Sequence, residues 1–118
     1  MKTDFSICIS IVKEYDGYRG NLNDTLLGCF YFATEYLETL THIKADYYIA
    51  CDVPYYNSKE DCLNNIKDWE QWYNNNETKI INLKSDSLRK LVFNKKIWWN
   101  DSTILKLVFN KESRKSNY

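Results

Sequence analysis

One helical stripe limits the folds open to this chain more than any other feature. Apolar residues recur three or four positions apart, a spacing typical of one face of an amphipathic helix; they are Leu22, Leu26, Phe30, Ala33, Leu37 and Leu40. Asn21 or Asn23 can serve as the N-cap, and Asp24 suits the positive first turn. We predict a helix over residues 22–42, whose apolar stripe requires a second layer of structure to cover it.

Alternating apolar residues predict a strand on each side of this helix. Residues 4–14 place Phe and three Ile at every second position, a period of two that indicates a strand. Residues 46–53 alternate in the same way through Tyr47, Ile49, Cys51 and Val53. Pro54 is expected to end this second strand because proline has no N–H to donate to a ladder.

The second half of the chain predicts one more helix and then strands. Cys62, Ile66, Trp69 and Tyr73 share a helical face, and Ser58 with Asp61 forms a cap-like pair, so we predict a helix over 58–74. Three apolar runs after it suggest strands; they cover residues 79–83, 88–99 and 103–110. The last two would form a hairpin, because Asn100 and Asp101 between them are turn residues.

The predicted order is therefore β-α-β-α-β-β-β, which corresponds to the α+β class. The economical arrangement is two layers, with a mixed β-sheet and both helices packed on one face. A length of 118 residues with 44% hydrophobic residues is enough for one domain with its own core. We assign residues 1–111 to that domain and residues 112–118 to a flexible C-terminal tail.

The cysteines and the N-terminus indicate a reducing compartment. The start of the chain lacks the pattern of a secretory signal, and no apolar run approaches the roughly 20 residues that a membrane span needs. The four cysteines lie in apolar segments and form no Cys-x-x-Cys pair, so we expect reduced, buried thiols, no zinc and a cytoplasmic protein; they are Cys8, Cys29, Cys51 and Cys62.

The net charge is zero, but acidic and basic residues are distributed unevenly along the chain. Residues 1–83 carry 7 basic and 13 acidic residues, whereas residues 84–118 carry 9 basic and 3 acidic residues. Neutrality argues against a general coat for nucleic acid. The asymmetry has two interpretations: charged side chains that merely solvate two layers, or an acidic face that meets a complementary partner.

Recognisable catalytic chemistry is missing from the sequence. The single histidine, His42, falls at the end of the first predicted helix, where a structural role is favoured. The chain contains no phosphate-binding loop, no nucleophile elbow and no two-histidine metal motif. Asp52 could form a carboxylate cluster with Glu14 and Asp16, but exposed acids are common on loops. We therefore expect neither an enzyme nor a bound cofactor or metal.

Tyrosines and acids occur together in two predicted loops. Tyr15 and Tyr18 lie in the first loop, and Tyr55 and Tyr56 lie just after Pro54 in the second. If the two preceding strands are parallel, both loops emerge at one end of the sheet. Tyrosine is favoured at protein interfaces because it combines a large ring with a polar tip. The alternative is that these tyrosines are partly packed loop residues.

The C-terminal third offers a competing interpretation. Basic and aromatic residues are interleaved there; they are Arg89, Lys90, Phe93, Lys95, Lys96, Trp98, Trp99 and Lys106. Such a sheet face could stack the bases of single-stranded nucleic acid. The aromatic signature of the RRM fold is absent, however, which makes nucleic acid the second choice.

Two resemblances favour a protein partner. Tyr18 to Leu26 is similar to the loop-into-helix segment with which barstar-type ribonuclease inhibitors present Tyr and Asp to a toxin. In overall character, a small chain rich in Asn, Tyr and Lys resembles bacterial immunity proteins of contact-dependent and polymorphic toxin systems. The resemblance implies an antitoxin that occludes a basic nuclease site, and the docking residues would be Glu14, Tyr15, Asp16, Tyr18, Asp24, Asp52, Tyr55 and Tyr56.

Overall fold

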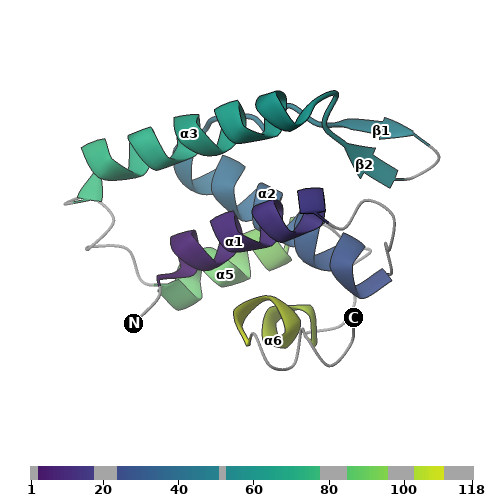
Figure 1. Ribbon diagram of the computed structural model, residues 1–118. Coiled ribbons are helices and arrows are strands. Elements are labelled where there is room, and N and C mark those ends of the chain that lie inside the picture. Colours follow the sequence, from purple (N-terminus) through teal and green to yellow (C-terminus); the bar gives the residue numbers. More distant parts are fainter. Residues whose placement is uncertain (1–2, 18–23, 51–52, 78–84, 96–102, 111–118) are drawn as a thin grey trace.

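Helices dominate the structure, a computed structural model that describes residues 3–17, 24–50, 53–77, 85–95 and 103–110. Over these residues the chain forms five helices and one short antiparallel hairpin (Figure 1). The elements are α1 (Asp4–Gly17), α2 (Asp24–Thr41), β1 (Tyr48–Ala50), β2 (Val53–Tyr55), α3 (Lys59–Asn75), α5 (Ser85–Phe93) and α6 (Thr103–Phe109). The prediction of an α+β fold with a mixed sheet is therefore wrong.

The first segment is a helix, although its isoleucines alternate as in a strand. Cys8 and Val12 are fully buried, whereas Ile7 is only half-buried, so the buried set follows the helical spacing Phe5, Cys8, Ile9, Val12. Thr3 begins the helix by accepting a hydrogen bond from the Ser6 N–H at 3.1 Å. Cysteine acts here as a small apolar residue, and counting it as one reveals the helical period.

The central helix α2 confirms the strongest prediction. Its two ends differ from the predicted range 22–42 by at most two residues. Phe30, Phe32, Ala33 and Leu37 are fully buried, because α1, α3, α5 and α6 all pack against this helix. Thr41 is its last residue, and the exposed His42 follows in a left-handed conformation with φ 62°.

The second predicted strand is a hairpin instead of a single strand. β1 pairs with β2 in antiparallel register, with Tyr48 opposite Tyr55 and Ile49 opposite Pro54. Pro54 therefore lies inside a strand, and the prediction that it ends one is wrong. A strand of a two-stranded ribbon has a free edge, which is where a proline is tolerated.

The helix α3 confirms the second predicted helix and its cap. Ser58 is the N-cap, and its hydroxyl accepts a hydrogen bond from the Asp61 N–H at 3.1 Å. The buried face consists of Cys62, Asn65, Ile66 and Trp69.

Two helices replace the predicted C-terminal strands. α5 buries Val92 and half-buries Leu88, and α6 buries Val108 and half-buries Ile104, which in both cases is a spacing of four. A short apolar run fits both the strand period of two and the helical period of about 3.6 residues. Packing against α2 favours the helix in both segments. The predicted strand 79–83, the Asn100–Asp101 turn, Trp98, Trp99 and the tail 112–118 lie outside the described residues.

Candidate functional site

The hairpin presents the two most exposed large apolar side chains among the described residues, Ile49 and Tyr48; Leu91 on α5 and Leu63 on α3 are also exposed. Tyr48 is 54% exposed, Ile49 is 60% exposed and Tyr55 is 37% exposed. The rings of Tyr48 and Tyr55 lie opposite each other with centroids 5.8 Å apart. The hairpin extends beyond one end of α3, away from α5 and α6 (Figure 1). Tyr48 and Tyr55 therefore form an aromatic contact surface on one face of the hairpin, whereas Ile49, which pairs with Pro54, projects from the opposite face.

A polar depression of about 450 Å³ adjoins this hairpin. Its walls come from the segment before β1 and from the first turns of α3; they are Lys44, Ala45, Asp46, Tyr47, Tyr48, Asp61 and Asn64. Asp46 and Asp61 are exposed, and neither forms an ion pair with another described residue. We refer to Tyr48, Tyr55, Asp46 and Asp61 together as the hairpin surface.

A buried amide holds the depression and the hairpin against α3. The Asn65 Oδ1 accepts hydrogen bonds from the Tyr56 hydroxyl at 2.8 Å and from the Asp46 N–H at 2.9 Å. Its Nδ2 donates to the Lys44 carbonyl at 3.3 Å. Burial raises the pKa of the Tyr56 hydroxyl, which keeps it protonated as a donor. The Asn65 side chain thus anchors the hairpin on both sides, at Lys44 and Asp46 before β1 and at Tyr56 after β2.

Two further hydrogen bonds attach this region to the core. The Trp69 Nε1 donates to the Ile43 carbonyl at 3.0 Å. The Tyr15 hydroxyl, at the end of α1, donates to the Pro54 carbonyl on β2. The Tyr15 ring also stacks on Phe30, with centroids 4.1 Å apart. The hairpin is therefore positioned by α1, α2 and α3 together, even though its outer side is exposed.

The predicted docking residues have different environments in the structure. Tyr55 is exposed on the hairpin, and Glu14 is half-buried. Tyr15 and Tyr56 are buried, so they support the hairpin surface from inside. Asp16 and Asp24 occupy the last turn of α1 and the first position of α2. Tyr18 and Asp52 lie outside the described residues.

The structure does bring the two predicted tyrosine segments together. The hydrogen bond from Tyr15 to Pro54 places the end of α1 next to the residue that precedes Tyr55. Parallel strands, the reason given for this proximity, are not the cause, since a helix and a hairpin strand make the contact. Tyr48 and Ile49 were missed as site residues. The sequence signal for them was the alternation of apolar residues over 46–53, a short segment with one face that can remain exposed.

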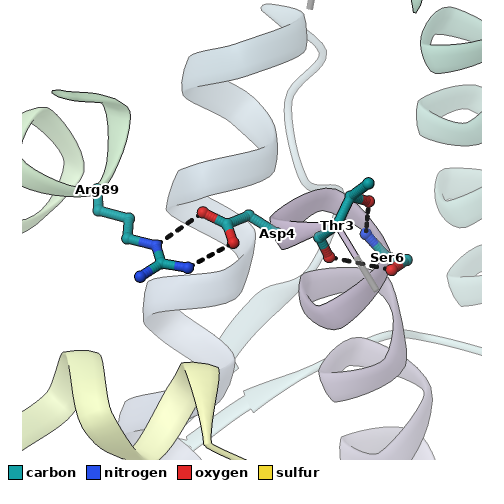
Figure 2. A network of polar contacts seen from close by, with 4 residues as sticks. All are labelled: Thr3, Asp4, Ser6 and Arg89. Atoms are coloured by element: carbon teal, nitrogen blue, oxygen red, sulfur yellow. Dashed lines mark hydrogen bonds and ion pairs between the residues drawn. The ribbon is translucent and has the colours of Figure 1, made fainter. Parts of the chain in front are cut away.

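Two basic residues of the C-terminal region, Arg89 and Lys95, contact other helices of the molecule. Arg89 forms a two-pronged ion pair with Asp4, with nitrogen–oxygen distances of 2.6 and 2.7 Å (Figure 2). The same guanidinium lies 3.9 Å from the ring centroid of Phe109 on α6. Lys95 contacts Thr39 at 2.8 Å and Glu35 at 3.8 Å. These cations connect α5 to α1, α2 and α6.

Comparison with other proteins gives no family for this chain. No family model, no curated protein and no solved structure matches it. Among the residues that the structure describes, no three His, Cys, Asp or Glu side chains gather as metal ligands would. None of the described helices combines the length and the apolar character that crossing a membrane requires.

Proposed function

We propose that the chain is a protein-interaction module that binds a partner with a basic surface through the hairpin surface. The observation that supports this most directly is the exposed Tyr48–Tyr55 pair beside a depression lined by Asp46 and Asp61. Aromatic side chains supply contact area at little entropic cost, and surrounding carboxylates attract and orient a cationic partner.

The charge around the hairpin agrees with such a partner. Exposed acids outnumber exposed lysines on residues 44–77; the acids are Asp46, Glu60, Asp61, Asp68, Glu70 and Glu77, and the lysines are Lys44, Lys59 and Lys67. Nearest the hairpin, the acids Asp46, Glu60 and Asp61 exceed the lysines Lys44 and Lys59 by one charge, and the other acids extend along α3. This excess favours the approach of a basic protein at low salt. It favours a protein partner over nucleic acid at this surface, because phosphates would be repelled.

The most specific form of the proposal is an immunity protein that neutralises a nuclease-type toxin. Nucleases bind phosphates with basic active sites, and carboxylates on a small inhibitor can occupy the same positions. Binding would then occlude the toxin's active site without any chemical reaction. The described cysteines Cys8, Cys29 and Cys62 are buried and form no disulfide with one another, which fits the cytoplasmic location that this function implies.

The competing functions have weaker support. Nucleic-acid binding was expected to use a flat, two-stranded face, but the described parts of that region are α5 and α6. The Arg89 guanidinium is also occupied by Asp4 and Phe109. A carboxylate-dependent enzyme would need Asp52 near Glu14 and Asp16, and no observation supports that cluster.

The proposal is tested by capture followed by titration. The tagged chain is used to isolate its partner from the native cell, the partner is identified by mass spectrometry, and affinity is measured by calorimetry. The variant Asp46→Lys/Asp61→Lys is expected to bind about 100-fold more weakly, because two attractive contacts become repulsive. The control Glu70→Lys/Glu77→Lys makes the same charge change farther along α3 and should lose less than about fivefold.

Three outcomes would contradict the proposal. Equal losses for both double variants would indicate nonspecific charge attraction. An unchanged affinity for Asp46→Lys/Asp61→Lys would exclude the hairpin surface as the docking site. A partner that is a nuclease but stays fully active with stoichiometric wild-type chain would rule out occlusion.

A further inference from the structure

The backbone of β1 has an open edge, and Pro54 determines which groups it presents. Proline has no N–H, so Ile49 and Pro54 cannot exchange two hydrogen bonds across the hairpin. They therefore form a non-hydrogen-bonded pair, and the ladder bonds fall to the neighbouring pairs, Tyr48 with Tyr55 and Ala50 with Val53. Consequently, the N–H and C=O groups of Ile49 point away from β2, toward the outer edge of β1.

The two edges of the hairpin are not equivalent. On β2, Pro54 is buried, offers no donor, and its carbonyl already accepts the Tyr15 hydroxyl. That edge is closed to strand addition. On β1, all three residues are exposed, and among the described residues outside the hairpin none forms a hydrogen bond with Ile49. β1 thus presents one donor and one acceptor at the spacing of a strand.

We infer that β1 binds an extended, basic segment of the partner protein as a third strand. This inference rests on the proposed function and states how the partner docks. Ile49 would donate one backbone hydrogen bond and accept another, which fixes the direction and register of the incoming segment. A basic side chain of that segment would reach the depression beside Tyr48, where Asp46 and Asp61 are exposed.

Charge complementarity selects this occupant over a second copy of the chain. Pairing of two β1 edges about a two-fold axis would bring together two depressions in which Asp46 and Asp61 outnumber Lys44, and two α3 starts in which Glu60 and Asp61 outnumber Lys59. Like charges across an interface cost free energy. A basic extended segment has no such cost, and it gains from the same carboxylates.

The first experiment uses a synthetic probe. The peptide Thr-Lys-Val-Arg-Val-Lys-Thr, with blocked ends, is added to the full ¹⁵N-labelled chain, and amide hydrogen exchange is followed by NMR. Exchange of the Ile49 N–H should slow about tenfold. A peptide methylated on its backbone nitrogens should have no effect, and a peptide with Glu in place of Lys and Arg should bind at least about tenfold more weakly.

A matched pair of variants isolates the backbone donor. Ile49→Pro removes the outward N–H but leaves the bonds between β1 and β2 intact, whereas Ile49→Val keeps that N–H and changes the side chain about as little as possible. We expect Ile49→Pro to lower peptide affinity about tenfold and Ile49→Val to lower it less than about twofold. Circular dichroism and the NMR signals of Tyr55 show whether each variant retains the hairpin.

The outcomes separate this inference from the proposed function. Peptide binding without slower exchange at Ile49, or equal losses for the two variants, would overturn strand addition. So would slow exchange at Ile49 that depends on protein concentration without peptide, since that indicates a second copy. If the captured partner binds and Ile49 exchanges at its free rate in the complex, the proposed function stands and strand addition fails. If no partner is captured but the peptide protects the Ile49 N–H, strand addition at β1 stands and the proposed function fails.

Discussion

The hairpin end and the α5–α6 end of this molecule both carry charged side chains, but they use them differently. At the hairpin end, Asp46 and Asp61 are exposed next to large apolar side chains. At the other end, Arg89 is enclosed by Asp4 and Phe109, and Lys95 contacts α2. Asp46 and Asp61 are therefore available for a partner, whereas Arg89 and Lys95 take part in helix packing; Lys90 and Lys106 at that end are exposed.

The means of support differ as well. A buried amide and two hydroxyls hold the hairpin through neutral hydrogen bonds, three of them with backbone groups and one between the Tyr56 hydroxyl and Asn65. The α5 helix is held by an ion pair and by apolar contacts with α2. Neutral bonds leave the acids of the hairpin surface uncompensated, so stability and binding can be altered separately there. The following variants test that separation.

The largest loss is expected from Asn65→Ala. It leaves the Tyr56 hydroxyl, the Asp46 N–H and the Lys44 carbonyl without their buried partner. The free energy of unfolding should fall by about 3 kcal/mol, measured by urea unfolding with tryptophan fluorescence. Asn64→Ala, at the exposed neighbouring position, should change it by less than about 0.5 kcal/mol. A loss below about 1 kcal/mol for Asn65→Ala would show that the network does not hold the hairpin.

Asp4→Asn is expected to cost about 1.5 kcal/mol in the other region. The carboxylate of Asp4 is only 10% exposed and binds both prongs of Arg89, so removing its charge weakens two charge-assisted bonds. A double-mutant cycle with Arg89→Met measures the coupling. Affinity for the captured partner should be unchanged, because the pair is remote from the hairpin. A partner affinity that drops with Asp4→Asn would break the proposed division of roles.

Tyr15→Phe should cost about 1 kcal/mol, since it removes one hydroxyl and keeps the ring stacked on Phe30. Amide exchange of the hairpin should become faster, while exchange in α5 stays the same. Tyr55→Phe, on the exposed side, should leave stability within about 0.5 kcal/mol of wild type. If Tyr15→Phe leaves hairpin exchange unchanged, α1 does not position the hairpin.

Helix length explains which parts of the fold the sequence could predict. The helices α2 and α3 contain 18 and 17 residues, more than four turns each, so their apolar residues recur often enough to identify a helix. Ser58 also marks the start of α3. The α5 and α6 helices span nine and seven residues, too short for the two periods to separate. In α1, the alternating isoleucines imitate a strand, and only the burial of Cys8 and Val12 reveals the helix.

The candidate site was predicted in part for a related reason. Sequence showed that tyrosines and acids cluster around Pro54, and Tyr55 is exposed there. It could not show that Tyr15 and Tyr56 are buried, because that depends on Pro54 and Asn65 accepting their hydroxyls from distant elements. Tyr48 was missed because it was assigned to a sheet strand, and only tyrosines in the predicted loops were considered as docking residues.

The smallest effect is expected from Glu38→Gln, at the junction of the two regions. Glu38 accepts the Ala45 N–H on the way to the hairpin, and Glu35 beside it contacts Lys95 after α5. Burial, which outweighs that hydrogen bond, raises the pKa of Glu38 above its ordinary value of 4.5. The folded state therefore binds the proton more tightly than the unfolded state, and this carboxyl contributes less stability as the pH rises above 4.5.

The glutamine variant removes this titration and can still accept the Ala45 N–H through its amide oxygen. Relative to Glu38→Gln, the wild-type free energy of unfolding should fall as the pH increases from 4.5 and level off once Glu38 is ionised in the folded state. Urea unfolding at a series of pH values measures the difference. A difference that is constant, or that grows in favour of the wild type, would mean that the Ala45 N–H and nearby lysines dominate over burial. The junction would then behave like the charge-compensated α5–α6 end.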